Sequence, residues 1–266
     1  MRLEPEGDST RAASAAGCNQ ALRARPGPYN PNAGNQRVPG GVWITMKTQA
    51  VTLMAACIVV ATLRASTFPD PLKDIRTTAP APPQTTVLAG GCFWGVEAVF
   101  EQLNGVLDVV SGYAGGSQLT AHYSVVSSGV TSHAESVQIT YDPVKISYGQ
   151  LLKVFFAVAH DPTELNRQGP DEGPQYRSSI FYANEEQKAV AEAYVRQLNG
   201  ARVFSRPVVT TVVPLKGFYP AEDYHQNFLA RNPDYPYIVV NDLPKLRALK
   251  SEFPELLKAT PAAKKK

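Results

Sequence analysis

The sequence predicts an α/β (α+β) domain that follows a disordered N-terminal leader. From about residue 85 onward, strand-like runs of alternating apolar residues are interleaved with runs that keep a helical apolar period. Such interleaving is typical of layered α/β architectures. Of the 266 residues, 44% are hydrophobic and 18% are charged, which is enough apolar material for one domain with a sizeable core.

The charge and the cysteine content exclude several classes of protein. The net charge of +3 comes from 26 Lys and Arg against 23 Asp and Glu. Because this excess is small and scattered, it does not indicate nucleic-acid binding. Three cysteines are too few for a disulfide-dense scaffold or a four-cysteine zinc cluster.

The N-terminal third differs from the rest of the chain. Residues 1–45 are rich in Gly, Pro, Asn and Arg and lack an apolar period, so we interpret them as disordered or untranslated sequence. Residues 46–66 combine a positive start, Met46-Lys47, with the uncharged run AVTLMAACIVVATL, and are predicted to be a signal peptide or membrane anchor. A buried helix or a lipoprotein site at Cys57 are alternative interpretations of that run. The proline-rich residues 67–84 are expected to form a stiff linker.

The leader also carries the expectation on localisation. A signal peptide or anchor at 46–66 implies that the protein is exported or membrane-anchored, and therefore periplasmic or extracellular. Without that function of the leader, the protein would be cytoplasmic.

The folded domain is expected to span 85–258 and to begin with the strand 86–89, which Gly90-Gly91 ends with a turn. The elements expected next are a helix near 96–103, strands over 106–111 and 135–141, a helix over 148–159, a strand over 178–182, a helix from Asn184 to about 198 and a strand over 208–214. The strands alternate apolar and polar residues, as ESVQITY does at 135–141. Asn184 is an N-cap residue, and Asn199-Gly200 ends the helix that it begins. Residues 259–266 form a basic tail.

Cys92 is the first candidate for chemistry, within the sequence GGCFWG. It follows a predicted strand and lies at the first turn of a predicted helix. Unpaired N–H groups and the helix dipole favour an anion there, and this environment lowers the pKa of a thiol. The alternative is an inert buried cysteine.

Glu135 and the histidines are the second set of candidates. At the start of a strand, partial burial would raise the pKa of Glu135 and make it a proton donor; the alternative is a solvated carboxylate at the sheet edge. His133-Ala-Glu135 resembles the start of a zinc deaminase site, but no cysteine follows Cys92. The spacings of His122, His133, His160 and His225 match no standard metal site, so no metal is expected.

A polar, turn-rich loop over 169–178 (GPDEGPQYRS) is the third candidate, because such loops commonly carry functional side chains. An ordinary surface loop is the alternative.

Three stretches in the same order resemble the peptide methionine sulfoxide reductase A family. They are Gly90–Phe100 (GGCFWGVEAVF), Tyr123–Pro143 with Ser128-Gly129 and His133-Ala-Glu135, and His160–Ser178 (HDPTELNRQGPDEGPQYRS). Phe218–Gln226 (FYPAEDYHQ) is similar as well, and the resemblance extends over residues 86–255.

The resemblance implies a two-layer sandwich with a ferredoxin-like core that reduces methionine S-sulfoxide, free or in proteins, and so repairs oxidised proteins. It implies no cofactor; an external thiol such as thioredoxin, glutaredoxin or a small thiol would be the reductant. Cys92 would be the nucleophile that becomes a sulfenic acid, and Glu135 the acid. The other residues that match family positions are Tyr123, Tyr176 and Asp171 around the sulfoxide oxygen, and Phe93 and Trp94 around the S-methyl group. A monomer is expected.

The sequence departs from the family pattern in two respects. Pro170 and Pro174 stand where many members have Asn and Thr, and no resolving cysteine follows Cys92. Two other functions remain open at this point. One is a Cys-His acyl-transfer hydrolase using Cys92 with His133 or His160. The other is a non-catalytic peptide-binding module.

Overall fold

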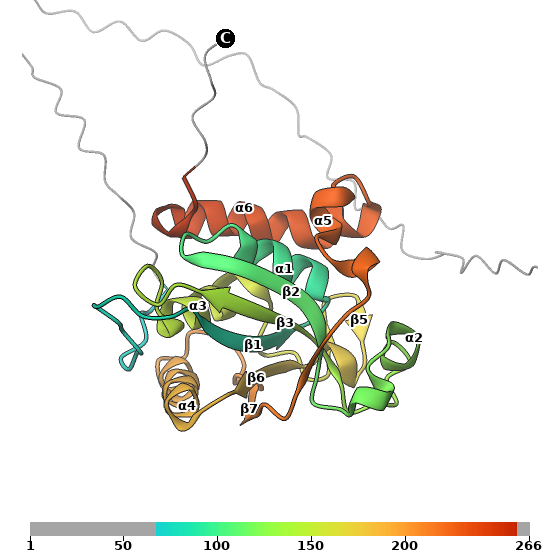
Figure 1. The fold of residues 1–266 in the computed structure, drawn as a ribbon, viewed down its shortest axis with the longest axis horizontal. Coiled ribbons are helices and arrows are strands. Elements are labelled where there is room, and N and C mark those ends of the chain that lie inside the picture. The colour runs from blue at the N-terminus through green and yellow to red at the C-terminus, as the bar shows by residue number, and fades with distance from the viewer. Residues whose placement is uncertain (1–67, 260–266) are drawn as a thin grey trace, which may run out of the picture. The chain divides into compact units, whose positions relative to one another are not determined.

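The computed structural model describes residues 68–259 (Figure 1). The interpretations of residues 1–45 and 46–66, and of the tail after residue 259, therefore concern residues outside this range. Within residues 68–259, none of the helices is both long enough and apolar enough to cross a membrane.

One six-stranded sheet organises the domain, with the strand order β7-β6-β1-β3-β2-β8. Its strands are β1 (Gln84–Gly90), β2 (Val106–Ala114), β3 (Ala134–Tyr141), β6 (Ser178–Tyr182), β7 (Thr211–Pro214) and β8 (Phe218–Pro220). Every neighbouring pair is antiparallel except the parallel pair of β6 and β7. Strands β6-β1-β3-β2 have ferredoxin-like order, and β7 and β8 extend the sheet at its two edges. The predicted fold class is confirmed.

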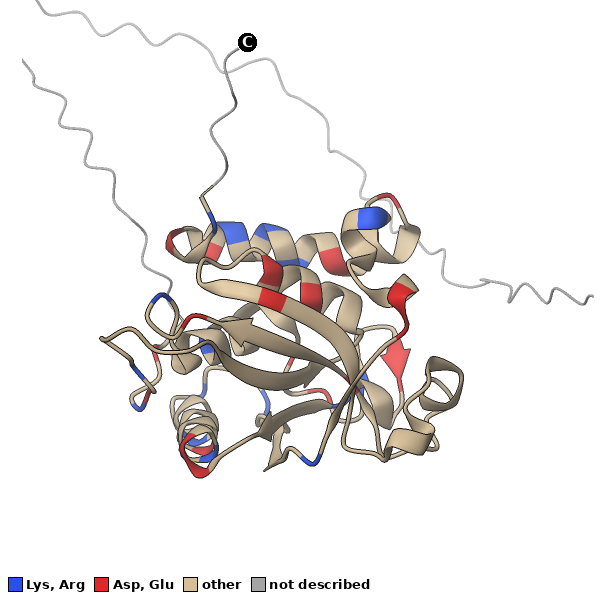
Figure 2. Ribbon diagram, in the orientation of Figure 1, with Lys and Arg blue, Asp and Glu red and all other residues tan. Residues whose placement is uncertain are grey.

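The helices connect these strands and cover the sheet. They are α1 (Phe93–Glu101), α2 (Tyr123–Val126), α3 (Tyr148–Val154), α4 (Glu185–Gly200), α5 (Phe228–Arg231) and α6 (Leu243–Glu252). In Figure 1, α1 lies between the sheet and α6, and α4 lies beside β6 and β7. A two-residue ladder joins β4 (Arg167–Gln168) to β5 (Asp171–Glu172) in the polar loop. Acidic and basic positions are interspersed along α4, whereas α6 carries basic positions and ends on the acidic Glu252 (Figure 2).

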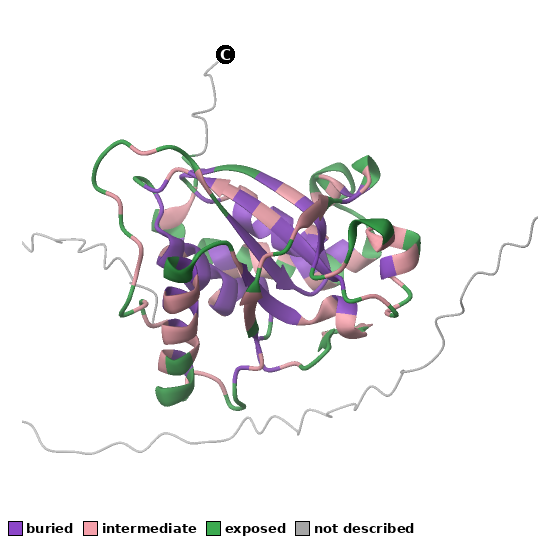
Figure 3. Cartoon of the chain, turned by 60° about the horizontal axis from the view of Figure 1, so that its bottom comes forward, coloured by how far each residue is buried: buried purple, intermediate pink, exposed green. Residues whose placement is uncertain are grey.

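The main core lies between the sheet and the helices, where Figure 3 shows buried strands and buried inner helix faces. Alternation along β3 turns Val137, Ile139 and Tyr141 into this core, whereas Ala134 joins a smaller cluster on the opposite face. Glu135 is in phase with Val137, so it also faces the helices. The strand pattern therefore directs the Glu135 carboxyl toward α1.

Two predicted elements differ from the observed ones. The helix predicted over 148–159 is α-helical only to Val154 and continues as a π-helix over Phe155–Ala159. The strand predicted over 208–214 begins at Thr211, because its pairing with β6 starts there and the backbone N–H of Val209 instead donates to the Pro162 carbonyl.

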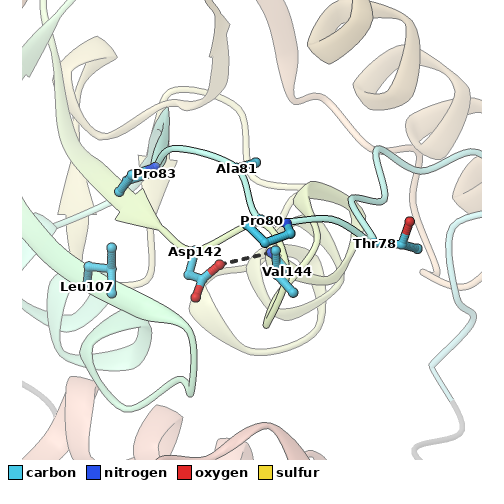
Figure 4. Close-up of a pocket in the computed structure, with 7 residues that line it drawn as sticks. All are labelled: Thr78, Pro80, Ala81, Pro83, Leu107, Asp142 and Val144. Atoms are coloured by element: carbon cyan, nitrogen blue, oxygen red, sulfur yellow. Dashed lines mark hydrogen bonds between the residues drawn. The ribbon is translucent and has the colours of Figure 1, made fainter.

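Residues 68–83, predicted as part of a linker, pack against the domain. The Tyr194 hydroxyl on α4 donates to the Pro69 carbonyl at 2.6 Å, and Lys153 on α3 pairs with Asp70 at 2.8 Å. Farther along, the segment passes over a shallow cavity of about 370 Å³ (Figure 4). The cavity is lined by Thr78, Pro80, Ala81, Pro83, Leu107, Asp142 and Val144.

Asp74 attaches the segment at the N-terminus of α3. Its carboxylate accepts hydrogen bonds from the Ser147 hydroxyl and the Gly149 N–H, both at 2.6 Å. Ser147 is itself the N-cap and forms a capping box with Gln150. Asp74, which precedes Ser147 by 73 residues in the sequence, thus adds a second cap to α3.

We expect Asp74→Ala to lower the free energy of unfolding by about 1–3 kcal/mol, because two donors at the start of α3 lose a buried acceptor. Urea denaturation followed by circular dichroism measures the change. Asp74→Asn, which keeps one acceptor oxygen, should lose less. Equal stability of Asp74→Ala and the native protein would show that the Asp74 cap does not stabilise the fold.

Candidate active site

Cys92 lies at the junction of β1 and α1. It is the N-cap residue of α1 and is only 8% exposed. Gly91 precedes it with φ +89°, a left-handed conformation that favours glycine. A Cβ at Gly91 would also lie 2.5 Å from Cγ of Gln168, so the polar loop packs directly on this turn.

Glu135 contributes a carboxyl group to the site. Its Oε2 accepts the backbone N–H of Phe93 at 3.1 Å, which places the carboxyl at the first turn of α1, next to Cys92. The residue is 2% exposed. Burial is the main reason that the pKa of Glu135 is raised to about 8, with the charge of Asp171 adding to it. A substantial fraction of Glu135 is therefore protonated at neutral pH.

Three phenols and a carboxyl group complete the polar side of the site. Tyr123 begins α2, Tyr176 ends the 3-10 turn Pro174–Tyr176, and Asp171 lies in β5. Burial raises the pKa of Tyr123 to about 12 and also raises that of Tyr176, and electrostatic interactions with Glu135 and Cys92 contribute to both shifts. Tyr237 donates a short hydrogen bond to Asp171. All four side chains keep part of their surface exposed.

Trp94 forms an aromatic platform beside this polar group. Its ring stacks on Phe228 with centroids 3.7 Å apart and an interplanar angle of 9°, and its Nε1–H donates to Nδ1 of His225 at 3.1 Å. Burial lowers the pKa of His225, which keeps the imidazole neutral and able to accept that hydrogen bond. Phe93 lies deeper, 1% exposed, against His225 and Tyr113. Trp94 therefore presents the partly exposed apolar surface, whereas Phe93 is buried and packs on His225, the residue that accepts the Trp94 hydrogen bond.

The electrostatic environment of Cys92 differs from the one expected for a helix N-terminus. The Trp94 N–H and Lys245 act to lower the pKa of the Cys92 thiol. Burial, together with the charges of Glu135 and Asp242, outweighs them and raises this pKa. Cys92 is therefore a thiol in the resting site, and the prediction of a lowered pKa was wrong because it considered the helix without the burial and the two carboxylates.

Neither histidine of the alternative Cys-His pair contacts the thiol. His160 uses both ring nitrogens, on the Phe155 carbonyl at 3.0 Å and the Ser178 hydroxyl at 2.6 Å, and burial lowers its pKa to about 3. His133 uses Nε2 on the Ser117 carbonyl at 2.9 Å. Within residues 68–259, no group of three His, Cys, Asp or Glu side chains is arranged to hold a metal ion.

Sequence reasoning missed the role of four residues of the site. Tyr237 and Phe228 come from the C-terminal region, for which no element was predicted, and His225 was considered only as a metal ligand. Glu222 accepts the Tyr123 N–H at 3.0 Å and the Tyr113 hydroxyl at 2.9 Å, so it supports the phenol side. The stretch FYPAEDYHQ at 218–226 was the available signal, because it holds two of these residues.

The site as a whole defines a class of enzyme. A buried thiol at a helix N-terminus, a carboxyl group with a raised pKa beside it and a cluster of phenols are the parts of a thiol-dependent oxidoreductase.

Comparison with known proteins specifies the family. The family model of peptide methionine sulfoxide reductase matches residues 84–257. MsrA 2 of Synechocystis sp. is 51% identical over 212 residues, which are 77% of this chain and 99% of that protein. MsrA 2 of Mesorhizobium japonicum is 57% identical over 178 residues, covering 67% of this chain and 91% of that protein.

Solved structures agree with these relatives. Reduced Mxr1 from Saccharomyces cerevisiae has a TM-score of 0.53 and 33% identity, over 60% of this chain and 91% of that one. Methionine sulfoxide reductase A of Corynebacterium diphtheriae has a TM-score of 0.51 and 32% identity, over 59% of this chain and 78% of that one. The chain belongs to the peptide methionine sulfoxide reductase A family. It is a peptide-methionine (S)-S-oxide reductase, a thiol-dependent oxidoreductase that repairs oxidised methionine.

Proposed function

We propose that Cys92 is the nucleophile and Glu135 the acid of this reduction. The observation that carries the proposal is the contact of Glu135 with the first turn of α1, in a buried setting that raises its pKa to about 8. The Cys92 sulfur attacks the sulfoxide sulfur while Glu135 protonates the oxygen. This attack forms an S–S bond. The protonated oxygen then passes from the substrate sulfur to the Cys92 sulfur, and the original S–O bond and the S–S bond both break. Cys92 is left as a sulfenic acid, and methionine leaves as the thioether. The thiol proton returns to Glu135, so atoms and charge balance.

The phenol cluster is proposed to receive the sulfoxide oxygen. Tyr123 and Tyr176 are half-buried, and their raised pKa values keep both hydroxyls protonated as donors. Asp171 is held in place by Tyr237 and orients this cluster from β5. Trp94, fixed by Phe228 and His225, takes the S-methyl group on its apolar face. A polar oxygen site on one side and an apolar methyl site on the other discriminate the two sulfoxide epimers.

A single-turnover assay with the separate epimers tests this function. The reduced protein should release methionine from the S epimer and at least about 100-fold less from the R epimer in the same time, because the wrong epimer places its oxygen against Trp94. Incubation with a chromogenic ester provides the comparison for a hydrolase. Ester cleavage without sulfoxide reduction would refute the proposed function.

External thiols are proposed to regenerate Cys92. The sequence from 93 to 266 contains no cysteine, and Cys18 and Cys57 belong to the leader, outside the described residues. The sulfenic acid is then open to a small thiol, or to a glutaredoxin acting on the mixed disulfide. Thioredoxin suits this route less well, since it reduces a preformed disulfide most readily.

We also propose that translation starts at Met46 and that residues 46–66 export the domain. The proposal rests on the positive start and the uncharged apolar run in the sequence. Cell fractionation should find the enzyme outside the cytoplasm, and mass spectrometry should find no native peptide from 1–45. A wholly cytoplasmic enzyme would contradict export, and peptides from 1–45 would contradict the start at Met46.

A further inference from the structure

An ion pair lies against α1 beside the proposed nucleophile. Nζ of Lys245 donates to Oδ1 of Asp242 at 3.0 Å. The Asp242 side chain is fully buried and that of Lys245 is 17% exposed. Asp242 is the last residue of the π-helix Ile238–Asp242 and the N-cap of α6, so the turn from one helix into the next sets the position of the pair.

Gly95 allows this pair to approach α1. A Cβ built on Gly95 would lie 2.0 Å from Oδ1 of Asp242 and 2.9 Å from Nζ of Lys245. Any larger residue at 95 would therefore displace the pair. Gly95 follows Cys92 by three residues, so it lies about one helical turn from the thiol. The two charges thus face the first turn of α1, where the Cys92 sulfur is held.

Stability does not explain the pair. The second carboxylate oxygen of Asp242, Oδ2, is buried and has no hydrogen-bond partner among residues 68–259. A buried pair gains little or nothing over apolar residues of similar size, and an oxygen left without a partner adds to its cost. A half-satisfied buried carboxylate with a lysine beside a reactive thiol indicates an electrostatic role instead.

The two charges act on Cys92 in opposite senses. Asp242 raises the pKa of the Cys92 thiol, and Lys245 lowers it. Lys245 also lowers the pKa of Asp171 in the polar cluster. Six titratable groups face the thiol: Glu135 from β3, Asp242 from the end of the π-helix, Lys245 from α6, Tyr123 from α2, Tyr176 from the 3-10 turn, and Tyr237 before the π-helix. Lys245 is the cation of this group.

We propose that Lys245, anchored by Asp242 against Gly95, is a positioning residue for the reaction: it supplies the positive charge that stabilises the Cys92 sulfur anion as it forms. Through Cys92 the inference rests on the proposed function. The geometry predicts the direction in which each substitution shifts the ionisation of Cys92. Without Lys245, the negative charge of Asp242 would face the first turn of α1 with no cation beside it and would disfavour the Cys92 thiolate. Without the charge of Asp242, the thiolate would be favoured.

Alkylation of Cys92 in the full-length reduced protein measures this directly and needs no reductase activity. The rate with iodoacetamide is followed across pH by mass spectrometry of the peptide that contains Cys92. Lys245→Met should raise the pKa of Cys92 and slow alkylation at pH 8 by about three- to tenfold. Lys245→Arg, which keeps the cation, should recover most of the rate. Lys250→Met is the matched control, since Lys250 is exposed on the same helix and should leave the profile unchanged.

Two further variants keep the inference testable if Lys245→Met fails to fold. Asp242→Asn should lower the pKa of Cys92 and speed alkylation. The double variant Asp242→Asn/Lys245→Met buries no unpaired charge, and its alkylation rate should lie between the rates of the two single variants. A pH profile that none of these changes move would overturn the role of Lys245. The reductase activity of Cys92→Ser tests the proposed function separately. If Cys92→Ser is inactive and the alkylation profiles do not move, the proposed function stands and only the role of Lys245 is refuted. If the profiles move but Cys92→Ser still reduces the sulfoxide, only the proposed function is refuted.

Discussion

Glu135→Gln is expected to slow single-turnover reduction of methionine S-sulfoxide by roughly 10²–10⁴-fold, the range typical of a positioned general acid. Glutamine keeps an oxygen that can accept the Phe93 N–H, so the contact with α1 survives. It cannot give a proton to the sulfoxide oxygen, and the S–O bond must then break without that help. Quench-flow measurement of released methionine gives the rate.

The pH dependence provides a second signature of the same residue. Only protonated Glu135 acts as the acid, and its pKa is raised to about 8. The native single-turnover rate should therefore fall as pH rises through about 8, and Glu135→Gln should lack this fall. A native rate that keeps rising above pH 9 in parallel with thiol ionisation would assign the acid to another group.

Glu97→Gln is the matched control for Glu135→Gln. Glu97 is also a buried carboxyl group, and burial raises its pKa to about 7, but it accepts the N–H of Asn227 instead of facing the thiol. Glutamine preserves that acceptor, so the rate should change less than tenfold. Stability provides a check on folding. Glu135 binds a proton in the folded state between pH 4.5 and about 8, so native stability falls with rising pH in that window and Glu135→Gln should not follow it.

Local patterns were sufficient to predict the parts of the site that follow from chain geometry. The glycine pair before Cys92 placed the thiol between a strand and a helix, as β1 and α1 confirm. Alternation in ESVQITY was enough to put Glu135 in phase with the core residues of β3. The order of the strands could not be predicted in this way, because the periodicity within a strand does not indicate which other strand it pairs with. The ferredoxin-like core came from the family resemblance.

The remaining parts depend on contacts between distant segments. Tyr237 reaches Asp171 across 66 residues, and Phe228, which follows the left-handed residue Asn227, stacks on Trp94. The raised pKa of Cys92 is a sum of burial and charges that converge from separate elements. A local sequence pattern does not report these distant contributions. The position of Cys92 was therefore predicted correctly, but the direction of its pKa shift was not.

Without added reductant, the protein is expected to release one methionine per chain and then stop. After the first reduction Cys92 carries a sulfenic acid, and the sequence after it offers no cysteine to form an internal disulfide. Cys92 should then react with dimedone in stoichiometric amount, and dithiothreitol should restore repeated turnover. Cys92→Ser should release no methionine under either condition, since serine cannot take the oxygen in a redox step.

The position of Cys92 gives the sulfenic acid a reason to persist. Cys92 is only 8% exposed, so access to its sulfur is limited, and a small thiol reaches it more easily than a protein disulfide reductase does. Turnover with glutathione and glutaredoxin should therefore exceed turnover with thioredoxin and its reductase. Full-length protein with Cys57→Ser and Cys18→Ser is the control, and it should behave like the native chain. A disulfide from Cys92 to either leader cysteine, formed after one turnover and reduced by thioredoxin, would instead establish a two-cysteine cycle.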